Sequence, residues 1–381
     1  MKKTIIMFVV FFWLFNFQVS AQTFEFELDD ETDLYQQMYD DYVGEDLYYS
    51  LPDEAKNLVD EFELTPSDPF SFNRLFSADG FEYFKNFFSE KLAFPLKSMS
   101  VILISVIVCA LCHSITGNSL QVNQSMNFMC ALSIVTAVII PLNSLVIEAV
   151  ELVDTINIFM GIFIPVFAGI LIASLKSGTA TAYSSVMFFV CEGISYCCNY
   201  LFLPLINCFS ALSIATGFSN SFKLSGITNF IKKTVYIALS AVMAVFLAVL
   251  SAQSFVSSAA DNVSSKTAKF IISSFVPIIG PSISESLGSL KSCIGLLRTS
   301  VGIYAVIAVV VMILPVLIKL IVFKLSLIIC SSSAEIFSLE TIKNMLDSIN
   351  QALSVVLAVV LCIGIMFVFS ITIVSMAGGL S

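Results

Sequence analysis

The run VGIYAVIAVVVMILPVLI (Val301–Ile318) decides the fold, because it carries no charged residue. A helix of this length nearly spans the hydrocarbon core of a bilayer, so the run predicts a membrane crossing. Lys319 and Lys324 follow on the same predicted helix. Lysines that face lipid at mid-depth cost several kcal/mol, so these two should snorkel, form ion pairs or face water. Two interpretations stay open: a plain crossing with a basic flank, or a pair of lysines that lines a pore or a subunit interface.

The segment just before this run has a different character, because polar residues interrupt it regularly. A helix over Ser282–Leu297 would place its apolar residues on one face, since they recur at alternating steps of four and three. Pro277 and Gly280 separate this helix from a preceding one that carries Lys266 and Lys269. We expect two amphipathic helices that lie in the membrane interface.

Composition places the whole chain among membrane proteins. Hydrophobic residues make up 57% and charged residues 12% of the 381 residues, and the mean hydropathy is +0.94. The net charge of −10 is concentrated near the N-terminus, where Gln22–Glu63 contains 15 of the 28 acidic residues and a single lysine, Lys56. The sequence shows no basic patch of the kind that phosphate contacts require, so nucleic acid is not an expected partner.

The first 21 residues have the pattern of a cleaved secretory signal peptide. Lys2 and Lys3 precede the apolar run Ile5–Phe17, and small residues follow at a cleavage spacing, which predicts cleavage after Ala21. The alternative is an uncleaved anchor helix. If cleavage occurs, the acidic region of residues 22–98 lies outside the cytoplasm. It could dock a partner, or it could stay solvated and partly disordered.

The remainder predicts an all-α polytopic membrane protein with about seven transmembrane helices plus amphipathic helices. Residues 99–256 should hold the first five crossings, 257–300 the amphipathic interfacial helices, and 301–381 the C-terminal crossings with an amphipathic connector. The expected crossings are Met99–Ile115, Phe128–Ile147, Ile156–Leu175, Tyr183–Leu212, Thr234–Val256, Val301–Leu327 and Ala352–Met376.

The fourth crossing leaves the topology open. It is overlong and is interrupted by Glu192, Gly193 and Pro204, so it could be one kinked helix or a re-entrant pair. Glu192 is itself a candidate site residue, because a carboxylate within a crossing is expensive. A lysine such as Lys319 is its candidate partner. The alternative for Glu192 is a helix break near the interface.

Catalytic chemistry finds little support in the sequence. Residues 109–113 read CALCH, which is the spacing of covalent c-type haem attachment, but they lie in an apolar crossing. His113 is the only histidine and lies in an apolar crossing, so it cannot complete an exposed Ser/His/Asp set. An HExxH zinc site needs two histidines and is absent from the sequence. The cysteines are more simply explained as small packing residues. We expect no enzyme activity, no cofactor and no metal.

The final third of the chain also resembles a known family. The segments that carry the resemblance are Ala260–Phe270 (ADNVSSKTAKF), Phe275–Gly280 (FVPIIG), Thr299–Gly302 (TSVG) followed by a crossing with Pro315 and Lys319, and Ile365–Ile373 (IMFVFSITI). In this order they resemble the stage III sporulation protein AE family of endospore-forming bacteria. A signal peptide followed by a non-membrane stretch and a polytopic block fits the same family.

The resemblance implies a non-enzymatic subunit of the secretion-like channel complex that links mother cell and forespore. It implies a multi-pass protein in the mother-cell membrane around the forespore. The implied partners are other proteins of the stage III sporulation A operon, including its ATPase and ring-forming members, and protein Q from the forespore side. Membrane lipids are further partners, and homo-oligomerisation stays open.

The candidate pore or interface residues are Glu192, Lys266, Lys269, Pro277, Gly280, Lys319 and Lys324. A stand-alone transporter or permease for small molecules or ions is the alternative function, and an inverted repeat with matched broken helices would favour it. An intramembrane enzyme is a more distant alternative, which loss of activity on replacing Glu192 while assembly survives would favour.

Overall fold

A computed structural model describes residues 29–65, 74, 78–115, 120–174, 176–215, 225–275 and 280–376. Within these residues the chain is built from helices and contains no β-strand, which confirms the all-α class. The expected signal peptide, residues 1–21, and Pro277 lie outside the described residues. The helices are α2 (Asp29–Tyr42), α3 (Asp46–Tyr49), α4 (Asp53–Glu61), α5 (Ala78–Ile115), α6 (Leu120–Ala173), α7 (Ser177–Tyr196), the π-helical segment η2 (Cys197–Phe202), α8 (Leu203–Ala215), α9 (Ser225–Phe275), α10 (Gly280–Ile336) and α11 (Glu340–Met376).

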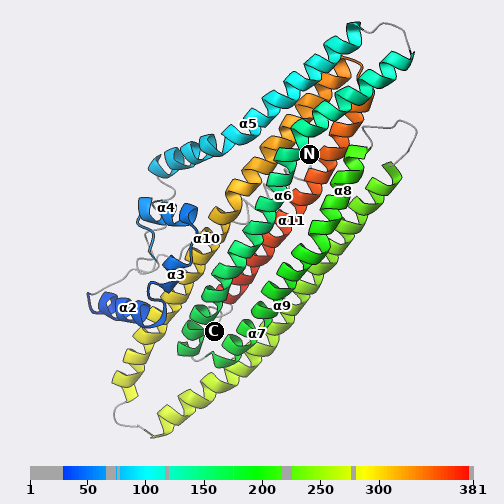
Figure 1. The fold of residues 1–381 in the computed structure, drawn as a ribbon. Coiled ribbons are helices and arrows are strands. Elements are labelled where there is room, and N and C mark those ends of the chain that lie inside the picture. The colour runs from blue at the N-terminus through cyan, green and yellow to red at the C-terminus, as the bar shows by residue number, and fades with distance from the viewer. Residues whose placement is uncertain are drawn as a thin grey trace.

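The long helices form one elongated bundle (Figure 1). α10 and α11 pack against each other, α5 and α6 contact α10, and α8 and α9 contact α11. In the described part of the chain, six helical stretches are long and apolar enough to cross a membrane. They are Lys85–Ser114, Phe128–Ala173, Ser177–Ala215, Asn229–Gln253, Ser292–Ile336 and Glu340–Ser375.

Several of these helices are much longer than a bilayer is thick. α6 has 54 residues, α9 has 51 and α10 has 57. At the rise of an α-helix they measure about 75 to 85 Å, whereas the hydrocarbon core is about 30 Å thick. An ordinary tilt does not absorb this difference. The bundle therefore extends beyond the hydrocarbon core.

The expected crossings Phe128–Ile147 and Ile156–Leu175 belong to one helix, α6, so the six spans replace the seven that were expected. The polar residues between them suggested a loop. However, residues 148–155 contain neither proline nor glycine, so nothing there breaks a helix. Glu151 and Asp154 lie on the exposed face of α6.

The fourth crossing is one continuous helical stretch rather than a re-entrant pair. α7, η2 and α8 follow one another without interruption from Ser177 to Ala215. The wider π-helical turn lies directly before Pro204, which cannot donate a backbone hydrogen bond, and such local adjustments accommodate proline in membrane helices. The Asn199 side chain donates to the Ser195 carbonyl, 3.1 Å away, and so satisfies one acceptor at this irregular turn.

Three of the expected region boundaries fall inside continuous helices. The boundary at 98/99 lies within α5, the one at 256/257 within α9 and the one at 300/301 within α10. The amphipathic segment 257–300 therefore consists of the end of α9 and the beginning of α10 instead of separate helices. α9 ends at Phe275 and α10 begins at Gly280, on either side of the expected break.

The bundle interior is filled by large apolar side chains. Phe159, Phe163 and Phe167 follow one face of α6 at one-turn spacing, and all three are fully buried. Their ring centroids lie 6.0 and 5.2 Å apart, and Phe167 meets the ring of Tyr183 on α7 edge-on at 5.8 Å. Aromatic pairs in this range add favourable contact energy beyond the buried area. These side chains join α6 to α7 through the core.

Two glycines allow α10 and α11 to approach closely. A Cβ atom at Gly302 of α10 would lie 2.6 Å from Oγ and 3.0 Å from Cβ of Ser375 on α11. A Cβ atom at Gly364 of α11 would lie 2.6 Å from Cδ1 of Ile313 on α10. Small residues at such positions let membrane helices pack backbone to backbone. The α10–α11 pair is therefore tightly packed at two points along its length.

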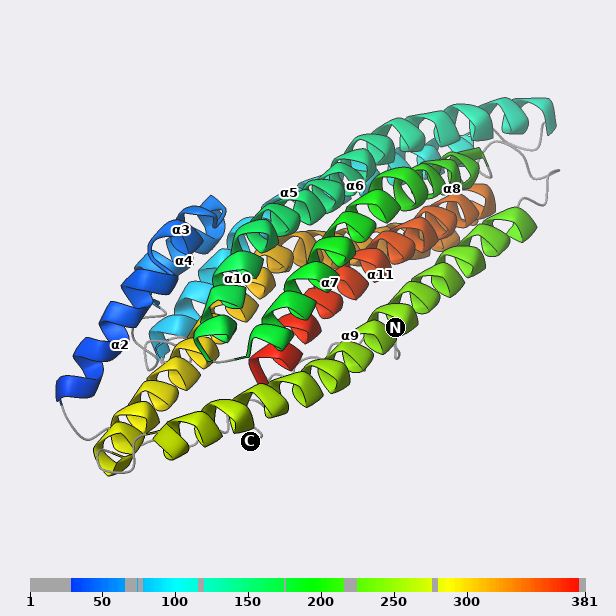
Figure 2. The ribbon, with the colours of Figure 1, turned by 90° about the horizontal axis from the view of Figure 1, so that it is seen from below.

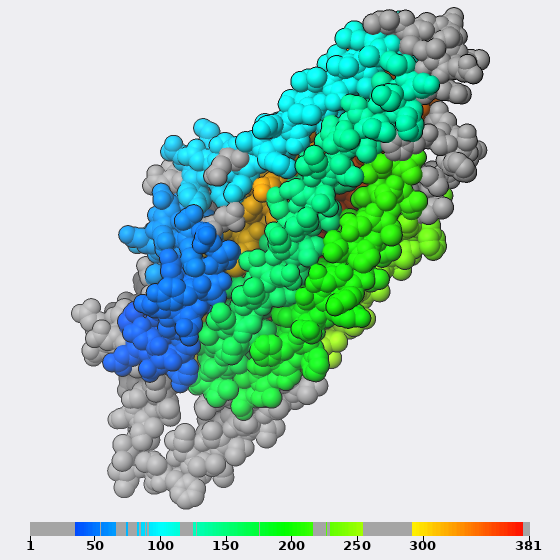
Figure 3. Space-filling view, in the orientation of Figure 1, coloured from blue at the N-terminus to red at the C-terminus, as the bar shows by residue number. Residues whose placement is uncertain are grey.

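Residues 29–65, called here the N-terminal cap, form a small folded unit on the side of the bundle (Figure 3). Its apolar residues Leu47, Leu58 and Leu64 are almost fully buried. α2 and α4 contact α10, and α2 and α3 contact α6 near its end. Tyr304 of α10 is buried close to this unit. The part of the acidic region that the structure describes is thus ordered by packing against the bundle.

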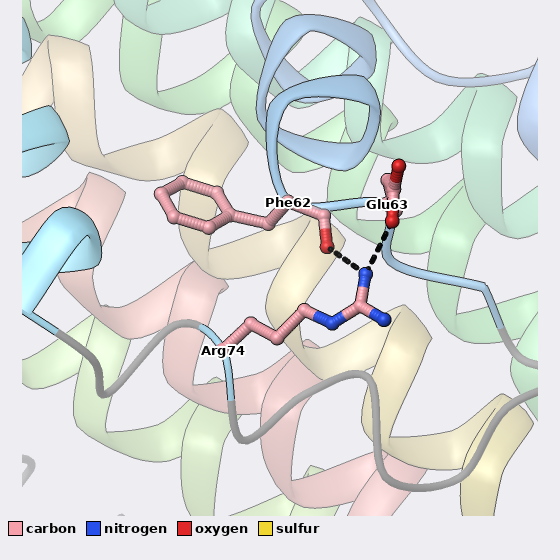
Figure 4. A network of polar contacts seen from close by, with 3 residues as sticks. All are labelled: Phe62, Glu63 and Arg74. Atoms are coloured by element: carbon pink, nitrogen blue, oxygen red, sulfur yellow. Dashed lines mark hydrogen bonds and ion pairs between the residues drawn. The ribbon is translucent and has the colours of Figure 1, made fainter.

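A polar contact closes the end of the cap. The guanidinium of Arg74 donates to the Glu63 carboxylate at 2.6 Å and to the Phe62 carbonyl at 3.4 Å (Figure 4). Both charged side chains are at least half exposed, so this ion pair adds little stability. Burial of Phe62, whose ring meets Tyr83 of α5 edge-on at 5.3 Å, holds the cap to α5 more effectively.

Candidate functional site

Charged residues within the bundle are the candidate functional site, and α10 carries three of them: the buried Arg298, Lys319 and Lys324. Lys319 donates to Glu148 of α6, with Nζ 2.8 Å from Oε2. Their side chains are 22% and 28% exposed, so the pair is largely shielded from the surroundings. A lone lysine or glutamate inside an apolar span is costly, and pairing the two reduces that cost. The pair therefore neutralises two charges between α6 and α10.

The partner of Lys319 differs from the one expected. The sequence suggested Glu192, but Glu192 lies exposed on α7, and none of the described residues pairs with it. Glu148 was overlooked because it fell between two expected crossings. The lack of a helix breaker between Ile147 and Ile156 is the signal that could have found it, since it places Glu148 within a continuous apolar helix.

Lys324, five residues further along α10, faces a different neighbour. It donates to the backbone carbonyl of Asn350, 3.5 Å away, and to the hydroxyl of Ser354, both on α11. The Tyr236 hydroxyl of α9 donates to the Ser354 carbonyl at 3.4 Å. These bonds join three membrane helices through neutral groups. The charged neighbour that acts on Lys324 is Lys232 of α9, which carries a like charge.

Glu192 occupies the outer surface of the bundle instead of its interior. It lies one turn before the π-helical segment η2, next to the exposed Gly193. Tyr196 and Tyr200 are also exposed there, with ring centroids 4.7 Å apart. This surface faces lipid or another protein, so Glu192 stays a candidate interface residue. It is not part of the Glu148–Lys319 pair.

The remaining candidates lie at the junction of α9 and α10. Lys266 and Lys269 belong to the last turns of α9, and Gly280 is the first residue of α10. The side chains of these two lysines and all of Pro277 lie outside the described parts of the chain.

Most cysteines of the cysteine-rich segments are small side chains that pack between helices. Cys109 of α5 is buried and meets Cys130 of α6 across the helix interface. Cys191 and Cys198 are buried, and Cys208 is exposed. Among the residues that the structure describes, no group of three or more His, Cys, Asp or Glu side chains is placed to hold a metal ion.

Comparisons with known proteins agree with the sequence resemblance. The model of the family described as Stage III sporulation protein AE (spore_III_AE) matches residues 68–378, which include Glu148, Lys319 and Lys324. The Stage III sporulation protein AE of Bacillus subtilis (strain 168) is 24% identical over 245 residues. This match covers 64% of the chain and 60% of the relative, so the chain spans less than two thirds of that protein. No solved structure matches the chain.

Proposed function

Because the chain belongs to the stage III sporulation protein AE family, we propose that it is a non-enzymatic membrane subunit of the channel complex between mother cell and forespore. The match over residues 68–378 carries this proposal, and a multi-pass bundle of helices fits it. The protein then resides in the mother-cell membrane that surrounds the forespore. Its partners are other products of the stage III sporulation A operon, including the ATPase and the ring-forming proteins, and the forespore-side protein Q.

Packing supports a conduit between chains instead of within one chain. The aromatic residues of α6 fill the interior. A crevice between α6, η2, α8 and α11 is lined by apolar residues such as Val153, Phe202 and Val356, and its volume is about 20 Å³. That is room for about one water molecule. A passage for larger species would therefore lie between copies of this chain or between this chain and its partners.

An orientation follows from six spans. If the N-terminal cap lies outside the cytoplasm, an even number of crossings returns the end of α11 to the cap side, where Ser375 packs beside Gly302. The turn between α10 and α11, and the start of α9 with Lys232 and Lys233, then face the mother-cell cytoplasm. Lysines on the cytoplasmic side agree with the positive-inside tendency. The ATPase would meet this end, and the ring-forming proteins and protein Q would meet the cap end.

The alternative of a stand-alone transporter receives less support. Transporters of that type bind substrate where paired helices are broken in the two halves of an inverted repeat. In the described residues α6, α9, α10 and α11 run without a break, and η2 is a single irregular turn. The channel subunit is therefore the function that we propose.

Photo-crosslinking in sporulating cells of the native bacterium tests the proposal. The gene is deleted and replaced by variants with a photoreactive amino acid at Tyr49 on the cap, at Phe337 in the α10–α11 turn, or at Phe189 on the lipid-facing surface; all three side chains are exposed. We expect Tyr49 to capture a ring-forming or forespore-side protein and Phe337 to capture the ATPase, while Phe189 gives no adduct to either. Normal forespore gene expression and normal spore yield in the deletion strain would refute the proposal.

A further inference from the structure

Three lysines gather at the end of the bundle that lies away from the N-terminal cap. Lys232 and Lys233 lie in the third turn of α9, and Lys324 lies on α10 within electrostatic reach of Lys232. Figure 2 shows α9 along the outer edge of the bundle, beside α7 and α11. Lys232 and Lys233 thus lie on the outer helix, whereas Lys324 lies partly buried against α11, where it and Tyr236 of α9 both bond to Ser354.

This cluster lacks a counter-charge among the described residues. The partners of Lys324 are a carbonyl and a hydroxyl, which are neutral. Among the acidic residues at this end, Asp347 accepts from Ser331 at 2.6 Å, Glu335 pairs with Lys343 at 2.6 Å, and Glu340 also lies near Lys343. Like charges gathered without an acid attract an anion from outside the chain.

The position of the cluster along α9 indicates where that anion resides. The candidate span of α9 is Asn229–Gln253, and the part that follows Lys233 rises about 30 Å, which equals the thickness of the hydrocarbon core. Ile237 and Val245 on this part are exposed, as expected for residues that face acyl chains. Lys232 and Lys233 therefore lie at the level of the lipid head groups.

The surface of α9 forms a hollow at this level. Its volume is about 470 Å³, and it is lined by Asn229, Lys232, Lys233, Tyr236, Ile237 and Ser240. Polar donors line the end near the lysines, whereas Ile237 leads toward the apolar part of the helix. The hollow, which α9 alone lines, thus combines two cationic side chains with neutral polar groups and one apolar side chain.

We propose that this hollow binds the phosphate of an anionic phospholipid head group. Lys232 and Lys233 contact the phosphate oxygens, Lys324 adds its charge from α10, and the acyl chains lie along α9 beyond Ile237. Basic residues at the cytoplasmic end of a membrane helix attract anionic lipid head groups. The bound lipid would supply the negative charge that the cluster lacks.

Native mass spectrometry of the full chain, released from nanodiscs of phosphatidylcholine and phosphatidylglycerol in equal parts, tests this proposal. Each lysine should contribute about fivefold to retention of phosphatidylglycerol, so K232Q/K324Q should retain about 25-fold less than the wild type. K85Q/K97Q, which removes two exposed lysines of α5, is the control with the same net charge. K232R/K324R should retain the lipid, because it keeps both charges.

Several outcomes would overturn the proposal. Equal retention by K232Q/K324Q and the wild type would do so, as would an equal loss in K85Q/K97Q, which would indicate a general charge effect. If K232Q/K324Q fails to fold, K233Q replaces it, since the exposed Lys233 makes no packing contribution and its loss should still lower retention about fivefold. If inorganic phosphate raises the thermal stability of the lipid-free protein as much as phosphatidylglycerol does, the site binds a soluble anion instead.

Discussion

The Nζ atom of Lys319 on α10 lies 2.8 Å from Oε2 of Glu148 on α6, although 171 positions separate the two residues in the chain. Both residues lie within candidate membrane spans. The pair therefore links two helices where an unpaired charge would be costly. Loss of this pair should lower the stability of the protein and weaken the packing of α6 against α10.

Replacing Lys319 by methionine should lower the free energy of unfolding by about 2 kcal/mol. Removing one partner of a fully buried ion pair costs about 3–5 kcal/mol, and the partial exposure of both side chains reduces this cost. Thermal unfolding of the purified protein in detergent measures the effect. The exchanged pair E148K/K319E should recover most of the stability, whereas E151Q, on the exposed face of α6, should change little. Equal losses in the single and exchanged variants would contradict a specific pair.

Gly302→Ala should destabilise the α10–α11 pair by about 1–3 kcal/mol, because the new methyl group would collide with Cβ and Oγ of Ser375. The matched control is Gly161→Ala on α6, where an added Cβ meets no atom within 4 Å. That control should be neutral or slightly stabilising, since alanine favours helices over glycine. Both are compared by thermal unfolding. A tolerated Gly302→Ala would indicate that the two helices are less closely packed.

Cysteine labelling should distinguish six spans from seven. In a background with all ten native cysteines replaced, Tyr49→Cys and Ser177→Cys should react with a membrane-impermeant maleimide from the same side. Phe337→Cys should react from the opposite side. A break of α6 into two crossings would instead place Ser177 opposite Tyr49, so labelling of these two from different sides would contradict the continuous helix.

Leu47→Ala should loosen the N-terminal cap, because Leu47 is only 1% exposed and its truncation leaves a cavity that costs about 2–5 kcal/mol. Hydrogen exchange of α2–α4 should then accelerate, whereas exchange of α6 and α11 should stay unchanged. Glu63→Gln is the control, since it removes the exposed ion pair with Arg74 and should cost about 1 kcal/mol or less. A larger effect of Glu63→Gln would mean that the ion pair, and not burial, holds the cap.

Local patterns predicted much of the fold and part of the site. The apolar runs located every candidate span, and the Pro277–Gly280 break located the end of α9 and the start of α10, because helix breakers act through their own backbone geometry. Lys319 and Lys324 stood out as costly charges. The continuity of α6 was missed because a short loop was expected between two crossings, although Glu151 and Asp154 are compatible with a helix whose polar face lies outward.

The amino-acid sequence by itself determined that this is a helical membrane protein and to which family it belongs, because hydropathy and ordered motifs are properties of contiguous segments. Only the tertiary structure decided that Lys319 pairs with Glu148 and not with Glu192, and that Tyr236 of α9 and Lys324 of α10 meet at Ser354 of α11. The physical reason is that the energy of a charge depends on what lies opposite to it, and that neighbour is set by the rotation and packing of helices far apart in the chain.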